Sequence, residues 1–176
     1  MLHRSLYLLL LASLPVSALT LDLDGLKVDL DEPDGTELYA YQAGHVLLLR
    51  PEGEALGVIY IYPVGEPGHS IEEITSFYDG DANAFLGDML ADLRRAITAG
   101  DRGPAFRWGG YNRTSAKGVP IASADYFNFG YYNLDSLLLV GKNLVHVDCY
   151  CHEDKAEAFR EVVLDALATI GEHGGA

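Results

Sequence analysis

The chain has 176 residues, with 12 lysines and arginines against 26 aspartates and glutamates, and a formal net charge of −14. A field of this sign repels nucleic acid and anionic lipid surfaces and favours a cationic partner. Its two cysteines, Cys149 and Cys151, are too few and too close together for a secreted scaffold that depends on disulfides. The composition therefore predicts a domain that is stabilised by its own core and binds no nucleic acid.

Residues 1–18 have the three-part pattern of a cleavable signal peptide. Arg4 precedes an apolar run at residues 6–14 (LYLLLLASL), and Pro15 and small residues lead to a cleavage site after Ala18. A membrane-spanning helix needs about 20 apolar residues, and polarity returns too early here for that alternative. No cysteine follows the apolar run to carry a lipid. We therefore expect residues 19–176 to be a single domain, periplasmic or secreted, with no membrane anchor after signal cleavage and a formal charge of −15.

Three helices are expected from apolar residues that recur at helical spacing. Ser70 and Glu73 form a capping box for a short helix that ends at Gly80. Asp81 can cap a second helix that ends at Gly100, and a third is expected over residues 154–170. The faces expected to be buried are Ile71, Ile74, Phe77 and Tyr78 in the first helix, Ala82, Phe85, Leu86, Met89, Leu90, Leu93 and Ile97 in the second, and Phe159, Val162, Val163, Ala166, Leu167 and Ile170 in the third.

The rest of the chain is expected to form β-strands. The expected strands are residues 20–30, 44–50, 56–62, one or two strands within 116–132, 136–140 and 144–151, with a tight hairpin at Gly141-Lys142-Asn143. Strands that are grouped apart from the helices indicate an α+β fold, in which amphipathic helices pack on an antiparallel sheet.

This order of elements resembles the PsbP-like superfamily, which includes the extrinsic photosystem subunit, a Ran-binding import factor and many bacterial envelope proteins. The resemblance covers residues 38–170. It depends on the strand pair 46–49 and 57–62, on the Lys117-Gly118-Val119-Pro120 lead into a strand, and on the closing hairpin at 137–151 with its amphipathic helix. It implies a protein that binds other proteins or assists assembly, and it supplies no site residue.

His146, Cys149, Cys151 and His152 include good ligands for zinc or copper. Side chains alternate along a strand, so the two histidines are expected on one face and the two cysteines, with Val145 and Val147, on the other. We therefore expect two buried thiols. A metal or small-ligand site on this strand remains the alternative, and it would need a β-bulge near Cys149.

No pattern typical of catalysis or of a bound cofactor is present. The chain lacks a G-x-S-x-G elbow, an H-E-x-x-H helix, a P-loop and a dinucleotide glycine fingerprint. The acidic N-terminal segment fails the spacing of an EF-hand loop because Pro33 and Asp34 occupy two of its required positions. We expect no enzymatic activity and no cofactor.

Aromatic residues gather in two segments, 106–113 and 126–133, both of which contain glycine. Tyrosine and tryptophan give a large contact area at low entropic cost, which favours a protein-binding surface. The simpler alternative is that Trp108 covers the edge of the sheet and that the tyrosines form cross-strand pairs. The candidate contact residues are Trp108, Tyr111, Tyr126, Tyr131 and Tyr132.

These observations predict a non-catalytic, exported module that binds a basic protein. Its sharpest form is an immunity protein that neutralises a toxin or hydrolase, because an acidic surface speeds the capture of a cationic partner. A general envelope maintenance or assembly factor is the second interpretation, and the metal or small-ligand protein is the third.

Overall fold

The computed structural model describes residues 18–64, 73, 75–99, 106–112 and 119–174. Residues 1–17 of the expected signal peptide lie outside this part of the chain. So do Ser70, Ile71 and Ile74 of the first expected helix, Gly100, and Lys117 and Gly118.

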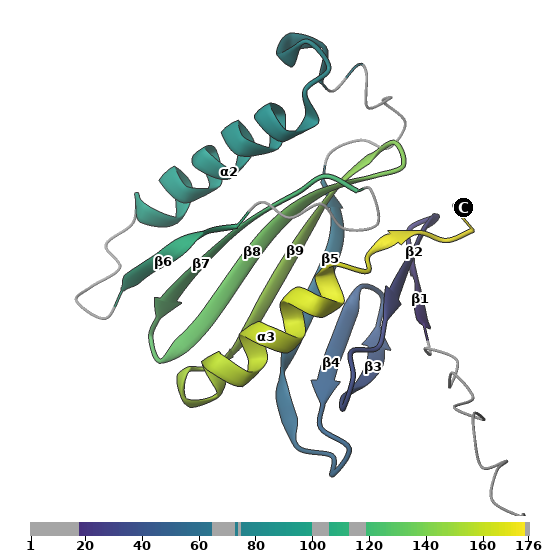
Figure 1. Ribbon diagram of the computed structural model, residues 1–176, viewed down its shortest axis with the longest axis vertical. Coiled ribbons are helices and arrows are strands. Elements are labelled where there is room, and N and C mark those ends of the chain that lie inside the picture. Colours follow the sequence, from purple (N-terminus) through teal and green to yellow (C-terminus); the bar gives the residue numbers. More distant parts are fainter. Residues whose placement is uncertain (1–17, 65–72, 74, 100–105, 113–118, 175–176) are drawn as a thin grey trace, which may run out of the picture.

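A seven-stranded antiparallel sheet forms the centre of the fold, in the order β3-β4-β5-β9-β8-β7-β6 (Figure 1). Neighbouring strands are joined mostly by short turns, as in the two-residue turn Gly141-Lys142 that pairs Val140 with Asn143. The α+β class expected from the sequence is confirmed. The strands are β3 (Glu37–Gln42), β4 (His45–Leu49), β5 (Ala55–Val64), β6 (Arg107–Asn112), β7 (Ile121–Asn128), β8 (Tyr131–Val140) and β9 (Asn143–His152).

A three-stranded sheet of order β1-β2-β10 lies beside the large one (Figure 1). It consists of β1 (Ala18–Leu23), β2 (Leu26–Asp31) and β10 (Gly171–Glu172). The expectation of one strand over residues 20–30 is wrong, because Asp24 and Gly25 both have positive φ and turn the chain back on itself. Gly171 follows the last helix, as expected, and then pairs with Asp29 as the start of β10.

The described helices are two α-helices and two short 3₁₀ turns, η1 (Ser76–Tyr78), α2 (Ala82–Thr98), η2 (Glu153–Lys155) and α3 (Ala156–Leu167). The side chain of Asp81 caps α2 by accepting hydrogen bonds from the amides of Asn83 and Ala84, as the sequence indicates. In the first expected helix, Phe77 is 94% exposed, so its assignment to a buried face is wrong.

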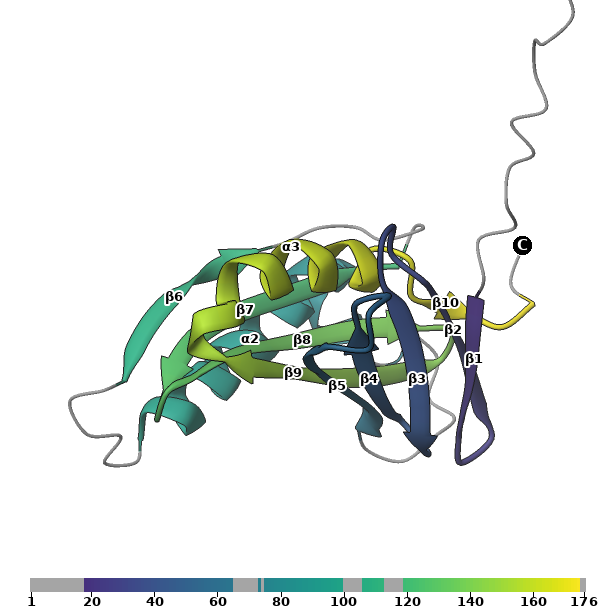
Figure 2. The same cartoon turned by 90° about the horizontal axis from the view of Figure 1, so that it is seen from below.

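The two α-helices lie on opposite faces of the large sheet (Figure 2). Helix α3 and the small sheet bury one face, in a core that includes Ile59, Leu138, Val147 and Phe159. Helix α2 packs on the other face, where Leu86 and Leu90 contact residues of β7 and β8 such as Ala124 and Leu137. Because α2 lies mainly over β7 and β8, with Trp108 of β6 at its edge, most of the second face has no described helix packed on it.

Candidate binding surface on the open face of the sheet

We define the open face as the part of the second sheet face that extends from β3 to the first half of β8, beyond α2. Strand register places its side chains in rows that cross the sheet. One row contains Asp135, Asp148, Tyr60 and His45, and the next contains Asn133, Tyr150, Val58 and Leu47. The polar and aromatic residues of the open face are Tyr39, Tyr41, His45, Tyr60, Tyr62, Tyr131, Asn133, Asp135, His146, Asp148, Tyr150 and His152.

Tyrosines provide most of the aromatic area of the open face. The hydroxyls of Tyr60 and Tyr150 are hydrogen-bonded at 2.9 Å, and the Tyr41 hydroxyl lies 3.5 Å from that of Tyr60. The Tyr131 ring meets the Tyr150 ring edge-on, with centroids 6.2 Å apart. Tyr39, Tyr41, Tyr62 and Tyr131 are 59%, 46%, 42% and 46% exposed. Such a surface offers apolar rings with polar tips, the composition that protein interfaces favour.

Two aspartates lie on β8 and β9, at the side of this face nearest to α2. Asp135 is 4% exposed, and its Oδ1 accepts a hydrogen bond from His146 Nε2 at 2.9 Å. With that nitrogen donating, His146 Nδ1 is left to accept from the Tyr62 hydroxyl. The other carboxylate oxygen of Asp135, Oδ2, is buried and has no hydrogen-bond partner among the described residues.

Asp148 lies directly opposite Asp135 on the neighbouring strand. Burial, and then the negative charge of Asp135, raise the pKa of Asp148 to about 6, while His146 acts in the opposite direction. Near neutral pH Asp148 is thus largely charged, in a position where charge is costly. The pair is best suited to receive a positive group from outside the described residues.

The candidate residues of the two aromatic segments do not form one surface. Trp108 and Tyr126 stack on each other, with rings 6.1 Å apart and 3° from parallel, and the Arg94 guanidinium lies 4.7 Å above the indole. Trp108 packs against the cluster beneath α2, which agrees with its interpretation as a cover for the sheet edge. Of the tyrosines, Tyr131 lies on the open face, while the side chain of Tyr111 is outside the described part of the structure.

Tyr132 does not belong to any contact surface, and its assignment as a binding residue is wrong. It is 1% exposed because β8 directs it towards α3, where its hydroxyl donates to Asp125 Oδ2 at 3.2 Å. Burial and the nearby Asp125 carboxylate raise its pKa. Tyr131, the residue before it in β8, points to the open face because side chains alternate along a strand.

The paired glycines beside Trp108 have a structural explanation. They lie in an edge strand, β6, whose register shifts between Trp108 and Gly110. A side chain at Gly109 would overlap Asp125 Oδ1, the atom that accepts a 2.5 Å hydrogen bond from the Gly110 amide. Glycine is therefore needed for the close approach of β6 to Asp125, and the aromatic segment around Trp108 is a bulged edge strand.

The cysteines and histidines of β9 lie on opposite faces of the sheet, as strand alternation predicts. Both thiols are free and buried, and burial raises the pKa of Cys149 well above its ordinary value and that of Cys151 to about 11. His146 and His152 face the open side. Within the described ranges, no group of three or more histidine, cysteine or acidic side chains is placed to hold a metal ion.

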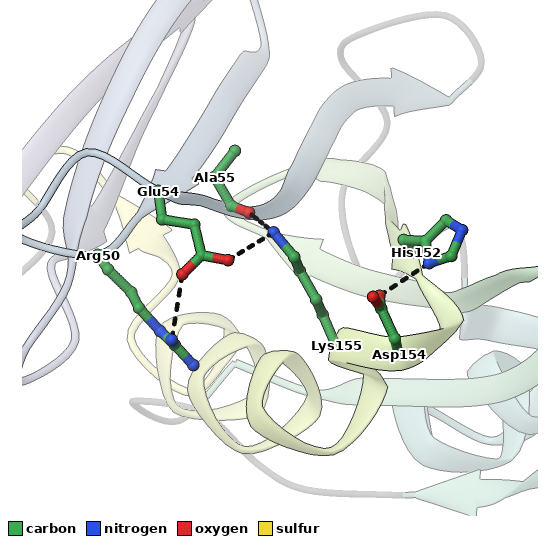
Figure 3. A network of polar contacts seen from close by, with 6 residues as sticks. All are labelled: Arg50, Glu54, Ala55, His152, Asp154 and Lys155. Atoms are coloured by element: carbon green, nitrogen blue, oxygen red, sulfur yellow. Dashed lines mark hydrogen bonds and ion pairs between the residues drawn. The ribbon is translucent and has the colours of Figure 1, made fainter.

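A second polar network joins the start of α3 to the β4–β5 turn (Figure 3). Lys155 Nζ donates to Glu54 Oε1 at 2.9 Å and to the Ala55 carbonyl at 2.7 Å, and Arg50 pairs with the other oxygen of Glu54 at 3.2 Å. The hydrogen bond and charge of Lys155 lower the pKa of Glu54. Each charge here already has a partner, so this network serves to position α3.

Most residues of the open face were not predicted from the sequence. Alternation identified the outward residues of β9, and the same period is present in Val58, Tyr60 and Tyr62 on β5. That signal could have shown two tyrosines on one face. Asp135 has no comparable signal, since the expected strand began one residue after it.

Comparisons with known proteins support the fold and no more. No protein-family model matches the chain, and no curated protein is similar to it in sequence. Among solved structures it is similar to the solution structure of cyanobacterial PsbP (CyanoP) from Synechocystis sp. PCC 6803, with a TM-score of 0.51 and 12% identity over 89% of this chain and 93% of that one. This likeness confirms a PsbP-like fold. None of the described helices is long and apolar enough to cross a membrane.

Proposed function

We propose that this protein is an exported, non-catalytic module that holds a basic partner protein on the open face of its sheet. The observation that carries the proposal is the arrangement of exposed tyrosines around the Asp135–Asp148 pair. Interfaces gain most of their energy from aromatic residues packed around desolvated groups, and here the desolvated groups are acidic. A fold of the PsbP type supplies a sheet on which such a face can be built.

The charge of the whole chain favours the same kind of partner. A formal net charge of −14 steers cationic proteins towards the surface and raises their association rate. The most specific form of the proposal is an immunity protein that blocks a cationic toxin or hydrolase. A general factor in envelope maintenance or assembly is the other form, and the two differ in whether the partner is dedicated and harmful when released.

The test is capture of the partner from envelope and secreted fractions of the source cells, followed by mass spectrometry. Wild-type protein should retain one dominant, basic, stoichiometric partner at low salt, and the double variant Tyr39→Ser/Tyr131→Ser should lose most of it. Both tyrosines are about half exposed, so the variant is expected to fold normally. Phe77→Ser is the matched control, because Phe77 is 94% exposed on η1, outside the open face.

Two results would contradict the proposal. One is the absence of any stoichiometric partner in repeated captures at low salt. The other is a partner that the double tyrosine variant retains as well as the Phe77→Ser control does, since that partner would bind elsewhere. If the partner is found, deletion of the gene separates the two forms: harm that depends on a co-encoded effector indicates immunity, and harm without one indicates envelope maintenance.

A further inference from the structure

The Asp135–Asp148 pair is an incomplete electrostatic site. Neighbouring strands lie about 4.8 Å apart, so residues directly opposite each other on one face bring their side chains into contact range. The only cationic or potentially cationic side chain that touches the pair among the described residues is His146, which bonds Asp135 Oδ1. Asp135 Oδ2 is buried without a donor. A buried acceptor with no donor is costly, and Asp148, which is partly exposed, is the carboxylate of the pair that a donor group from outside can reach.

We propose that the partly exposed Asp148, with the buried Asp135 beside it, receives the guanidinium of one arginine from the partner protein, with the rings of Tyr60 and Tyr62 next to it. This inference rests on the proposed function and names the chemistry of its central contact. Tyr60 is opposite Asp148 in the strand register, and Tyr62 contacts His146 by hydrogen bond and by ring packing. Both rings thus adjoin the acids.

A guanidinium fits this site better than other cations do. It presents five N–H donors in a plane, so it can bond the Asp148 carboxylate while the charge of Asp135 lies beside it, and it stacks favourably on tyrosine rings. A lysine ammonium is more strongly hydrated and cannot bond two carboxylates with the same planar fork. For a metal ion, the described residues offer no suitable group of three ligands.

The shape of the surface indicates a side chain of a protein as the source. Free small molecules are usually held in concave pockets. Three surface hollows that described residues form lie near the β4–β5 turn, near the β1–β2 turn and beside Arg160, and neither aspartate lines any of these three. The acid pair instead lies within a face that carries exposed tyrosines on both sides, at Tyr41 and Tyr131.

The experiment is an NMR titration of the purified protein with N-acetyl-arginine amide, which mimics an arginine within a polypeptide. Saturable shifts of the Asp148, Tyr60 and Tyr62 side-chain signals are expected. Binding should weaken at least about tenfold with the neutral isostere N-acetyl-citrulline amide, and equally in Asp148→Asn. Asp165→Asn removes the same charge from an exposed position on α3, on the other side of the sheet, and should bind like the wild type.

Three results would overturn the inference: no saturable shift at the acid pair, equal binding of arginine and citrulline amides, or equal binding by Asp148→Asn and Asp165→Asn. Free arginine that binds more than about tenfold more tightly than the capped form would also overturn it, because the site would then belong to a small amino acid. The titration uses no partner protein. A failed capture experiment therefore tells against the proposed function, and a failed titration against this site alone. If a partner is captured, Asp148→Asn should lower its affinity and Asp165→Asn should leave that affinity unchanged.

Discussion

Asp135 and Asp148 face each other across the β8–β9 pair, one of them almost fully buried and the other partly exposed. Their placement is a consequence of the two-residue turn at Gly141-Lys142, which fixes the register of the whole hairpin. Like charges directly opposite each other destabilise a sheet, so this pair lowers the stability of the fold. A cost of this kind within an exposed aromatic surface is typical of a binding site.

The first prediction concerns the pH dependence of stability. The pKa of Asp148 is raised from 3.8 to about 6 in the folded state, so the folded protein holds this proton more tightly than the unfolded chain does. The stabilisation is complete below about pH 4 and is lost as the pH rises through about 6. The asparagine of Asp148→Asn does not titrate, so the stability of this variant lacks the contribution of Asp148 to the pH dependence. Its free energy of unfolding relative to wild type should rise by about 1–2 kcal/mol between pH 4 and pH 7.5, after allowance for partial exposure.

Chemical denaturation of both proteins at several pH values measures this difference. Asp165→Asn is again the control, and its stability relative to wild type should change much less over the same interval. A difference between wild type and Asp148→Asn that stays constant with pH would show that Asp148 titrates normally.

The closing hairpin shows how far the sequence determines the site. Alternation correctly separated His146 and Asp148 from Cys149 and Cys151, because a strand has a fixed period of two. The expected turn, however, took in Gly141, Lys142 and Asn143, one residue more than the actual turn. That register would have placed residue 135 opposite Cys149, and the acid pair would not have formed. A one-residue shift in a turn moves every partner to the other face, which is why the site could not be predicted.

The open face itself depends on long-range packing. The apolar stripe of α2 was predicted from its period, and Leu86, Leu90 and Ile97 are indeed buried. Nothing in that stripe specifies that α2 lies mainly over β7 and β8. Nor does it specify that most of this face of β3, β4, β5 and β9 has no described helix packed on it. The arrangement follows from the pairing of strands distant in sequence, such as β5 with β9. Sequence reasoning therefore placed the aromatic surface around Trp108, at the edge that α2 covers.

The second prediction is that Gly109→Ala destabilises the fold. The added methyl group would overlap Asp125 Oδ1 and displace a carboxylate that bonds the Gly110 amide, Tyr132 and Arg160. We expect a loss of about 1–3 kcal/mol in the free energy of unfolding. Gly171→Ala is the matched control, since a side chain there would contact only the Thr169 carbonyl, at 4.0 Å. Equal stability of the two variants would mean that β6 can move away from Asp125 at little cost.

The third prediction distinguishes the two interpretations of Trp108. The indole packs under α2 and beneath Arg94, so Trp108→Ala should remove about 1–3 kcal/mol of stability, less than for a fully buried tryptophan. Thermal or chemical denaturation measures the loss, with Phe77→Ala as a control at an exposed aromatic position. A Trp108→Ala protein with wild-type stability that no longer captures the partner would instead place Trp108 in the interface.

The fourth prediction is that neither thiol reacts in the native protein. Cys149 is fully buried and Cys151 is 3% exposed, and burial raises both pKa values, so little thiolate exists near neutral pH and reagents cannot reach it. A thiol-specific chromogenic reagent should label neither residue in buffer and both in denaturant. The rate should follow the opening of the β5–β9–β8 core, and Gly109→Ala, which weakens the edge of this sheet, should speed it. Rapid labelling of native wild-type protein would show that β9 opens locally. That result would favour the alternative of a metal or small-ligand site that uses the thiols of this strand.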